Sequence, residues 1–146
     1  MERLLKYILL MLGFSTTSCY ALYAAPSVEY TVKGRVTDNE GKPVKGISVE
    51  YRAYNNEGYE AAASSTTVFS DDEGKFLIQN VEYEFELHKE LIFSDVDGEE
   101  NGGQFASTVV GLKFSEKDVT HVGEWTTTYV KNVGDVVLEY EQQQEE

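Results

Sequence analysis

The chain has 146 residues, with 12 basic and 26 acidic side chains, a net charge of −14 and a single cysteine. So acidic a chain lacks the basic side chains that neutralise phosphates, which excludes nucleic acid as a partner and argues against adhesion to anionic lipid headgroups. The length suits one ordinary domain, and a lone cysteine provides neither an internal disulfide nor a thiolate metal site. The fold is therefore expected to rely on an apolar core alone.

The N-terminal segment has the pattern of an export signal. A short basic start is followed by an apolar stretch from Tyr7 to Phe14 and by small residues directly before Cys19. Bacterial lipoprotein processing attaches a diacylglyceryl group to a cysteine in this position. We therefore predict a signal peptide over 1–18, lipidation of Cys19 and a tether over 19–28. The apolar stretch is too short to span a bilayer, so the lipid would provide the membrane attachment.

Two other interpretations of the leader stay open. The position three before the cysteine is usually aliphatic in a lipobox, and here it holds Thr16. An ordinary signal-peptidase site near Ala24 or Ala25 would instead leave an unmodified terminus at Pro26. In a further alternative, Cys19 is an incidental residue inside a longer leader.

From residue 29 onward the apolar residues alternate with the period of a strand. In the first segment, 30–37, one face holds Val32 and Val36, and the other face holds Lys33 and Arg35. A turn at 38–43 follows, and we expect the next strand to complete a hairpin. Strand-like segments run over 30–37, 47–52, 66–70, 75–79, 91–93, 105–114, 125–129 and 135–140.

The spacing of these segments defines the expected fold. About seven short strands separated by turns, without a long helical pattern, predict an all-β chain with a single antiparallel β-sandwich over 29–141. A barrel is the alternative. The last five residues, 142–146, are a polar tail that is too hydrophilic to pack.

Two short signatures in the first half of the domain resemble carboxypeptidase regulatory-like domains. The first is Tyr30-Thr-Val-Lys-Gly-Arg-Val-Thr-Asp38 with Gly41-Lys-Pro43, and the second is Ser70-Asp-Asp-Glu-Gly-Lys-Phe76. Those domains are transthyretin-like (prealbumin-like) β-sandwiches. The resemblance therefore implies that topology here.

A narrower resemblance covers nearly the whole chain. The leader before Cys19, the tether at 23–26, the acidic run 95–103, Trp125 and the closing segment 136–139 resemble the radical-SAM-associated lipoproteins of Bacteroidetes. The activity of that family is unknown. The resemblance implies export, lipidation, a sandwich fold and an association with a radical-SAM system, and it implies no catalytic residues.

The acidic run is the best sequence candidate for a ligand site. It places several hard oxygen donors on a glycine-rich loop, which is the supply of ligands that calcium prefers. The spacing imitates an EF-hand loop only in part, because its glycine comes too early. The alternative is a solvated turn whose acids bond nearby amides. The four candidate ligands are Asp95, Asp97, Glu99 and Asn101.

Other polar residues give weaker signals. His88 and His121 lie far apart, without a cysteine partner, and we expect each on the surface or satisfied locally. Glu82, Glu84 and Glu86 alternate along one segment. We expect them to form a solvated charged face rather than an acid–base pair in a cleft.

These observations lead us to expect a function that involves no catalysis. The sequence contains neither a nucleophile elbow nor a phosphate-cradling loop, so we expect no enzyme and no cofactor, calcium at Asp95–Asn101 excepted. We expect a lipid-anchored, non-enzymatic binding, accessory or structural module of the cell envelope. Alternatives are a substrate or partner of a radical-SAM maturation system, or a weak calcium- or carbohydrate-binding module, the latter using Trp125 and tyrosines. Tyr20, rather than an aspartate, follows the cysteine and favours the outer membrane.

Overall fold

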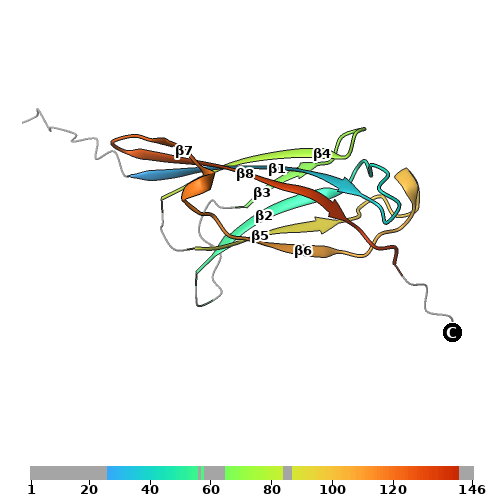
Figure 1. The fold of residues 1–146 in the computed structure, drawn as a ribbon. Helices are drawn as coiled ribbons and strands as arrows, with labels where there is room; N and C mark the ends of the chain where they lie inside the picture. Colours follow the sequence, from blue (N-terminus) through green and yellow to red (C-terminus); the bar gives the residue numbers. More distant parts are fainter. Residues whose placement is uncertain (1–25, 56, 58–64, 84–86, 142–146) are drawn as a thin grey trace, which may run out of the picture.

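The computed structural model describes residues 26–55, 57, 65–83 and 87–141. Cys19, the predicted leader, most of the predicted tether and the tail lie outside the described residues. The described chain forms two four-stranded sheets packed face to face (Figure 1), which confirms the all-β sandwich. The strands are β1 (Ser27–Thr37), β2 (Ser48–Tyr54), β3 (Thr66–Phe69), β4 (Lys75–Glu82), β5 (His88–Ser94), β6 (Thr108–Leu112), β7 (Val119–Val122) and β8 (Thr126–Val137), with 3₁₀ turns at η1 (Glu100–Gly102) and η2 (Glu116–Asp118).

The strand order differs from the expected hairpin. The first sheet has the order β4-β1-β8-β7 and the second has the order β3-β2-β5-β6. β1 pairs antiparallel with β4 and parallel with β8, whereas β2 lies in the other sheet. The expected hairpin of the first two strands is therefore wrong. Alternation reports which face of a strand is buried, but it does not report which strand lies beside it.

The last strand is longer than the sequence pattern suggests. We expected two closing segments, 125–129 and 135–140, and the structure has one 12-residue strand, β8. Its register against β1 shifts between Lys33 and Arg35, and Gly134 has a φ of +74° beside this shift. This is a β-bulge, which keeps a strand continuous where the local side-chain pattern is interrupted.

The core lies between the inner faces of the two sheets. The alternation predicted for β1 is confirmed, because Val32 and Val36 are fully buried. Phe76 of β4 meets Phe93 of β5 edge to face, with ring centroids 5.5 Å apart, and this contact joins the two sheets. Other fully buried side chains are Ile47, Val49, Tyr51, Ile78, Leu91 and Leu138.

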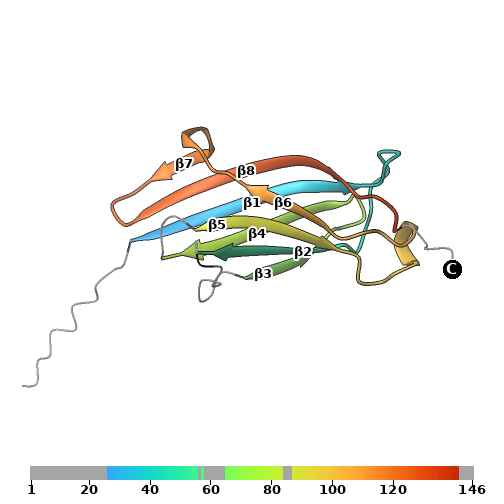
Figure 2. The ribbon, with the colours of Figure 1, turned by 90° about the horizontal axis from the view of Figure 1, so that it is seen from below.

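The sandwich has two distinct ends, which Figures 1 and 2 show from two directions. At the tether end, β1, β5 and β8 begin and β2, β4, β6 and β7 stop. At the turn end lie the connections 38–47, 70–74 and 95–107. Among the described residues there is no helix of the length and apolar character needed to cross a membrane.

Candidate functional site

A groove opens on the outer surface near the turn end. Its volume is about 630 Å³, a size typical of small-molecule sites. Phe69, at the end of β3, and Leu77 of β4 contribute its exposed apolar surface, and they are 60% and 53% exposed. Three basic side chains lie beside this apolar surface: Lys33, Arg35 and Lys75.

The strand register explains why these cations meet. Lys75 pairs with Arg35 across β4 and β1, and Arg35 pairs with Asp135 of β8. In the adjacent row, Leu77 lies opposite Lys33. Residues in one row of a sheet, at equivalent positions of the pleat, project from the same face. All three basic residues therefore share the outer face of the first sheet.

The groove cations have few partners within the protein. None of them takes part in an ion pair among the residues that the structure describes. The Nε of Arg35 donates to the backbone oxygen of Glu73 at 3.1 Å. The Oδ1 of Asp71 is occupied by the amides of Glu73 and Lys75. Like charges directly opposite each other in an antiparallel pair are destabilising, so Lys75 beside Arg35 is a local cost of folding.

Two glycines shape the floor of this groove. Gly34 lies beneath the β8 bulge, where an added Cβ would stand 2.6 Å from Cγ2 of Val133 and 2.8 Å from Cζ of Phe76. Gly134 forms the bulge itself with a positive φ. Bulges redirect side chains and often lie beside binding sites. The close approach of β8 over Gly34 thus positions the basic row at the rim of the groove.

A second polar cluster is buried at the tether end. The hydroxyl of Tyr51 donates to Glu82 Oε1 at 2.5 Å, and Lys89 Nζ lies 3.1 Å from Glu82 Oε2. Lys89 also donates to the backbone oxygen of Leu87 and lies 4.7 Å from the ring centroid of Tyr30. These residues link the two sheets, since Glu82 belongs to β4 while Tyr51 and Lys89 belong to β2 and β5.

Burial controls the ionisation of the two tyrosines in this cluster. Desolvation, followed by the hydrogen bond and the charge of Glu82, raises the pKa of Tyr51 well above its ordinary value. Desolvation and the Glu82 charge likewise raise the pKa of Tyr30. Both phenols therefore stay neutral over the physiological range.

The buried position of Glu82 corrects the expectation of a solvated glutamate face. β4 runs to residue 82, and every second residue from Phe76 through Ile78 to Glu82 faces the core. Tyr83, the next residue, is exposed. The alternation of apolar residues from Phe76 onward was the signal in the sequence that could have placed Glu82 inside. Glu84 and Glu86 lie outside the described residues.

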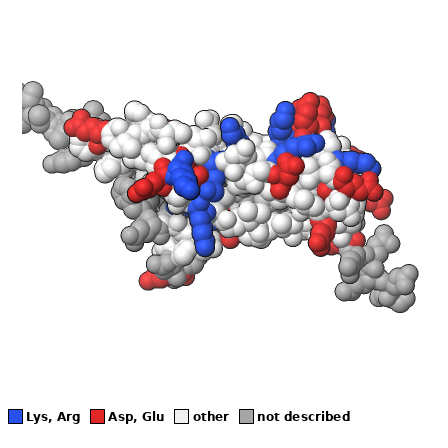
Figure 3. Space-filling model, viewed as in Figure 1, with Lys and Arg blue, Asp and Glu red and all other residues white. Residues whose placement is uncertain are grey.

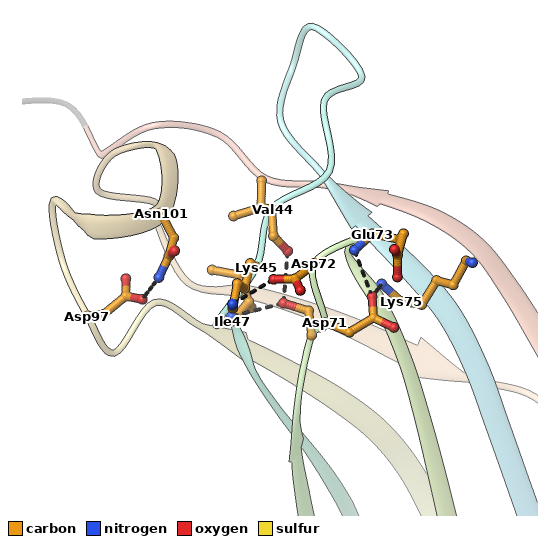
Figure 4. A network of polar contacts seen from close by, with 10 residues as sticks. Val44, Lys45, Ile47, Asp71, Asp72, Glu73, Lys75, Asp97 and Asn101 are labelled. Atoms are coloured by element: carbon orange, nitrogen blue, oxygen red, sulfur yellow. Dashed lines mark hydrogen bonds and ion pairs between the residues drawn. The ribbon is translucent and has the colours of Figure 1, made fainter.

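The residues of the predicted calcium loop mostly bond to the loop itself. Asp95 Oδ1 accepts from the amides of Asp97 and Gly98, and its Oδ2 accepts from the amide of Phe105 at 2.9 Å. Asp97 accepts from the side chain of Asn101, so that pair points inward across the loop (Figure 4). Glu99 precedes the η1 turn and makes no side-chain cap bond there. The described chain contains no group of three or more acidic, His or Cys side chains that could hold a metal ion.

The two histidines lie on different sheets. His88 begins β5 and stacks on Tyr54, with ring centroids 5.6 Å apart. His121 lies on β7 and is exposed. Trp125, considered for carbohydrate binding, is also exposed and lies next to the start of β8 at the tether end.

Comparisons with known proteins reveal a likeness in fold. No family model matches the sequence, and no curated protein matches it. Among solved structures, the chain is similar to the dioxygenase domain of a dioxygenase–carbohydrate-binding protein fusion from Streptomyces sp. SirexAA-E. The identity is 16%, the TM-score is 0.51, and the match covers 83% of this chain and 86% of that one. It is also similar to chlorocatechol 1,2-dioxygenase from Pseudomonas putida, with 11% identity, a TM-score of 0.50 and coverage of 82% and 69%.

The chain is shorter than several of these dioxygenases. It spans 57% of the length of hydroxyquinol 1,2-dioxygenase from Pseudomonas putida DLL-E4, where the identity is 15%, the TM-score is 0.49 and 78% of this chain is covered. It spans 60% of the length of 3-chlorocatechol 1,2-dioxygenase from Rhodococcus opacus 1CP. The two likenesses with TM-scores of 0.51 and 0.50 support the fold alone, because their sequence identities are 16% and 11%.

This likeness corrects two functional expectations. The expectation of a non-enzymatic binding, accessory or structural module, with its calcium and carbohydrate variants, is contradicted by this likeness, since the solved structures of similar fold are named as dioxygenases. The expectation of no cofactor, calcium excepted, is contradicted in the same way, since dioxygenases of similar fold suggest iron as a cofactor.

The described residues do not fit an iron site of their own. The two-histidine, one-carboxylate site of non-haem iron oxygenases needs convergent imidazole and carboxylate donors. Here His88 lies in the second sheet against Tyr54, His121 lies exposed in the first sheet, and the described residues contain no metal-ligating group of three.

Proposed function

We propose that this chain is an enzyme of the dioxygenase fold that takes a small aromatic anion as its substrate in the groove at the turn end. The observation behind the proposal is the set of three cations, without ion pairs among the described residues, on a chain of net charge −14. Figure 3 shows basic and acidic side chains interspersed on the face that it presents. The three groove cations are therefore not part of one broad basic surface on that face.

The groove offers both kinds of contact that such a substrate needs. Lys33 and Lys75 provide ammonium donors at its rim, and a hydrogen bond to a charged group contributes about 1.5–3 kcal/mol. Phe69 and Leu77 present exposed apolar surface on which a ring can pack. One solved structure of similar fold is named for chlorocatechol, which is a small aromatic compound.

The envelope location remains part of this proposal. The leader pattern and the position of Cys19 support export and attachment by lipid, with Tyr20 favouring the outer membrane. The resemblance to radical-SAM-associated lipoproteins supports membership of that family and a radical-SAM system, or another envelope protein, as partner. Mass spectrometry of the mature protein tests the anchor: an acylated N-terminal Cys19 is expected, and an unmodified terminus at Pro26 would contradict it.

Calorimetric titration tests the groove. The probes are 3,4-dihydroxybenzoate, which carries a carboxylate, and neutral catechol. The anion should bind more tightly than catechol, and Lys33→Gln/Lys75→Gln should weaken its binding at least about tenfold, equivalent to 1.4 kcal/mol. Lys117→Gln, on η2 and outside the groove, is the matched control.

The same samples test turnover. Loss of the ultraviolet absorbance of 3,4-dihydroxybenzoate is followed over time in air-saturated buffer, where dioxygen is the oxidant, and compared between the native chain and the double variant. Equal binding of both probes, or equal binding by the native chain and the double variant, would refute the groove as the site. Binding without any loss of absorbance would refute this compound as a substrate.

A further inference from the structure

Three large apolar or aromatic side chains are exposed at the tether end. Val122 is 73% exposed, Tyr83 is 66% exposed and Trp125 is 52% exposed. Val122 ends β7 and Trp125 precedes β8, so the two flank the tip of one hairpin. Tyr83 follows β4 directly. We call these three residues the apolar tip.

The chain enters the domain beside this tip. The amide of Ser27 donates to the backbone oxygen of Trp125 at 2.9 Å. Ser27 also lies opposite Thr126 at the start of the parallel β1–β8 pair, and their hydroxyl groups are 3.3 Å apart. Figures 1 and 2 both show β1 beginning next to the β7–β8 hairpin. On the other side of β1, Val28 pairs with Glu82, the residue before Tyr83.

The predicted lipid is therefore attached close to the apolar tip. Ser27 lies eight positions after Cys19, and eight residue steps span at most about 28 Å. This limit keeps the start of β1 within reach of the membrane surface. The groove lies at the opposite end of the sandwich, where Lys75 pairs with Arg35 near the far end of β1.

We propose that the apolar tip inserts into the headgroup region of the bilayer that holds the Cys19 lipid. Tryptophan and tyrosine favour this interface because each has an apolar ring and a polar group. The only charged residue between Val122 and Trp125 is Glu124, so the contact suits zwitterionic rather than anionic lipid. A single lipid would leave the domain free to rotate, whereas this second contact fixes the groove facing away from the membrane. The inference depends on the proposed anchor.

Fluorescence quenching tests the inference directly, because Trp125 is the only tryptophan in the chain. The native lipidated protein is reconstituted into phosphatidylcholine vesicles with and without bromine on the acyl chains. Emission from Trp125 should fall in brominated vesicles relative to vesicles without bromine, as expected for a ring at the interface. Unchanged emission would overturn the inference.

A matched variant moves the reporter to the other end of the molecule. In Trp125→Phe/Phe69→Trp the sole tryptophan stands at the groove, and its emission should not respond to brominated lipid. Equal quenching of both proteins would show nonspecific contact and overturn the proposed orientation. Mass spectrometry of the same samples separates the two proposals: a lipidated protein without quenching refutes the apolar tip alone, and a protein without the acyl mass refutes the anchor and the tip together.

Discussion

The two ends of this sandwich distribute charge and apolar surface in opposite ways. At the tether end, the ion pair of Glu82 and Lys89 is buried while Trp125 and Val122 are exposed. At the turn end, the Phe76–Phe93 contact is buried while basic side chains line an open groove. Buried charges must be satisfied inside the fold, whereas exposed charges remain available to a ligand. The buried polar cluster therefore contributes to stability, and the groove cations are available for the proposed recognition of a ligand.

The largest effect is expected in the buried cluster. Lys89→Met leaves the Glu82 carboxylate buried without its cation, which should lower the free energy of unfolding by about 3–5 kcal/mol. Urea denaturation measures the change. Glu82→Met/Lys89→Met removes both charges and should recover much of the loss. A loss below about 1 kcal/mol in the single variant would mean that this cluster is not structural.

A smaller loss is expected beneath the groove. Gly34→Ala places a Cβ 2.6 Å from Val133 and 2.8 Å from Phe76, so β8 must shift, at a cost of about 1–3 kcal/mol. Gly111→Ala in β6 is the control, because an added Cβ there meets nothing within 4 Å. Thermal unfolding compares the two variants. Equal melting temperatures would contradict the close β1–β8 approach that shapes the groove.

Alkaline pH should weaken the tether end. The pKa values of Tyr51 and Tyr30 are raised in the folded protein. The neutral phenols therefore contribute fully to the free energy of unfolding below the unfolded pKa of about 10, and this contribution is lost as the pH rises above that value. The free energy of unfolding should fall by up to about 1.4 kcal/mol per pH unit for each tyrosine. Tyr51→Phe should show a shallower slope between neutral pH and pH ~11. Identical slopes would contradict the burial of this phenol.

The smallest effect on stability is expected at the rim of the groove. Lys75→Gln removes a like charge opposite Arg35, so the free energy of unfolding should stay within about 0.5 kcal/mol or rise slightly, even though binding of 3,4-dihydroxybenzoate weakens. Urea denaturation and calorimetry on the same sample measure both quantities. A large loss of stability would place Lys75 among the structural charges and remove the contrast between the two ends.

The sequence predicted those features that depend on local alternation. It gave the all-β sandwich and the inward face of Val32 and Val36, and it placed Lys33 and Arg35 together on the opposite face. It could not place Lys75 beside Arg35, because that contact depends on which strands pair. The hairpin expected from neighbouring segments failed for the same reason.

The candidate site was the least predictable feature. The run of acidic residues predicted a calcium site at Asp95–Asn101, yet Asp95 and Asp97 accept hydrogen bonds from groups of their own loop. The predicted strand 75–79 ends before Glu82, whereas β4 continues to Glu82 and turns this side chain inward. The lipid at Cys19 remains a prediction from the leader, as does the radical-SAM association from the resemblance.

Chemical-shift mapping tests the proposed function of the groove most directly. ¹⁵N-labelled protein is titrated with 3,4-dihydroxybenzoate, and backbone amide shifts are followed residue by residue. The largest changes should fall at Lys33, Gly34 and Leu77, with little change at Val122. Changes concentrated at the tether end, or no change at saturating probe, would contradict the assignment of recognition to the basic groove.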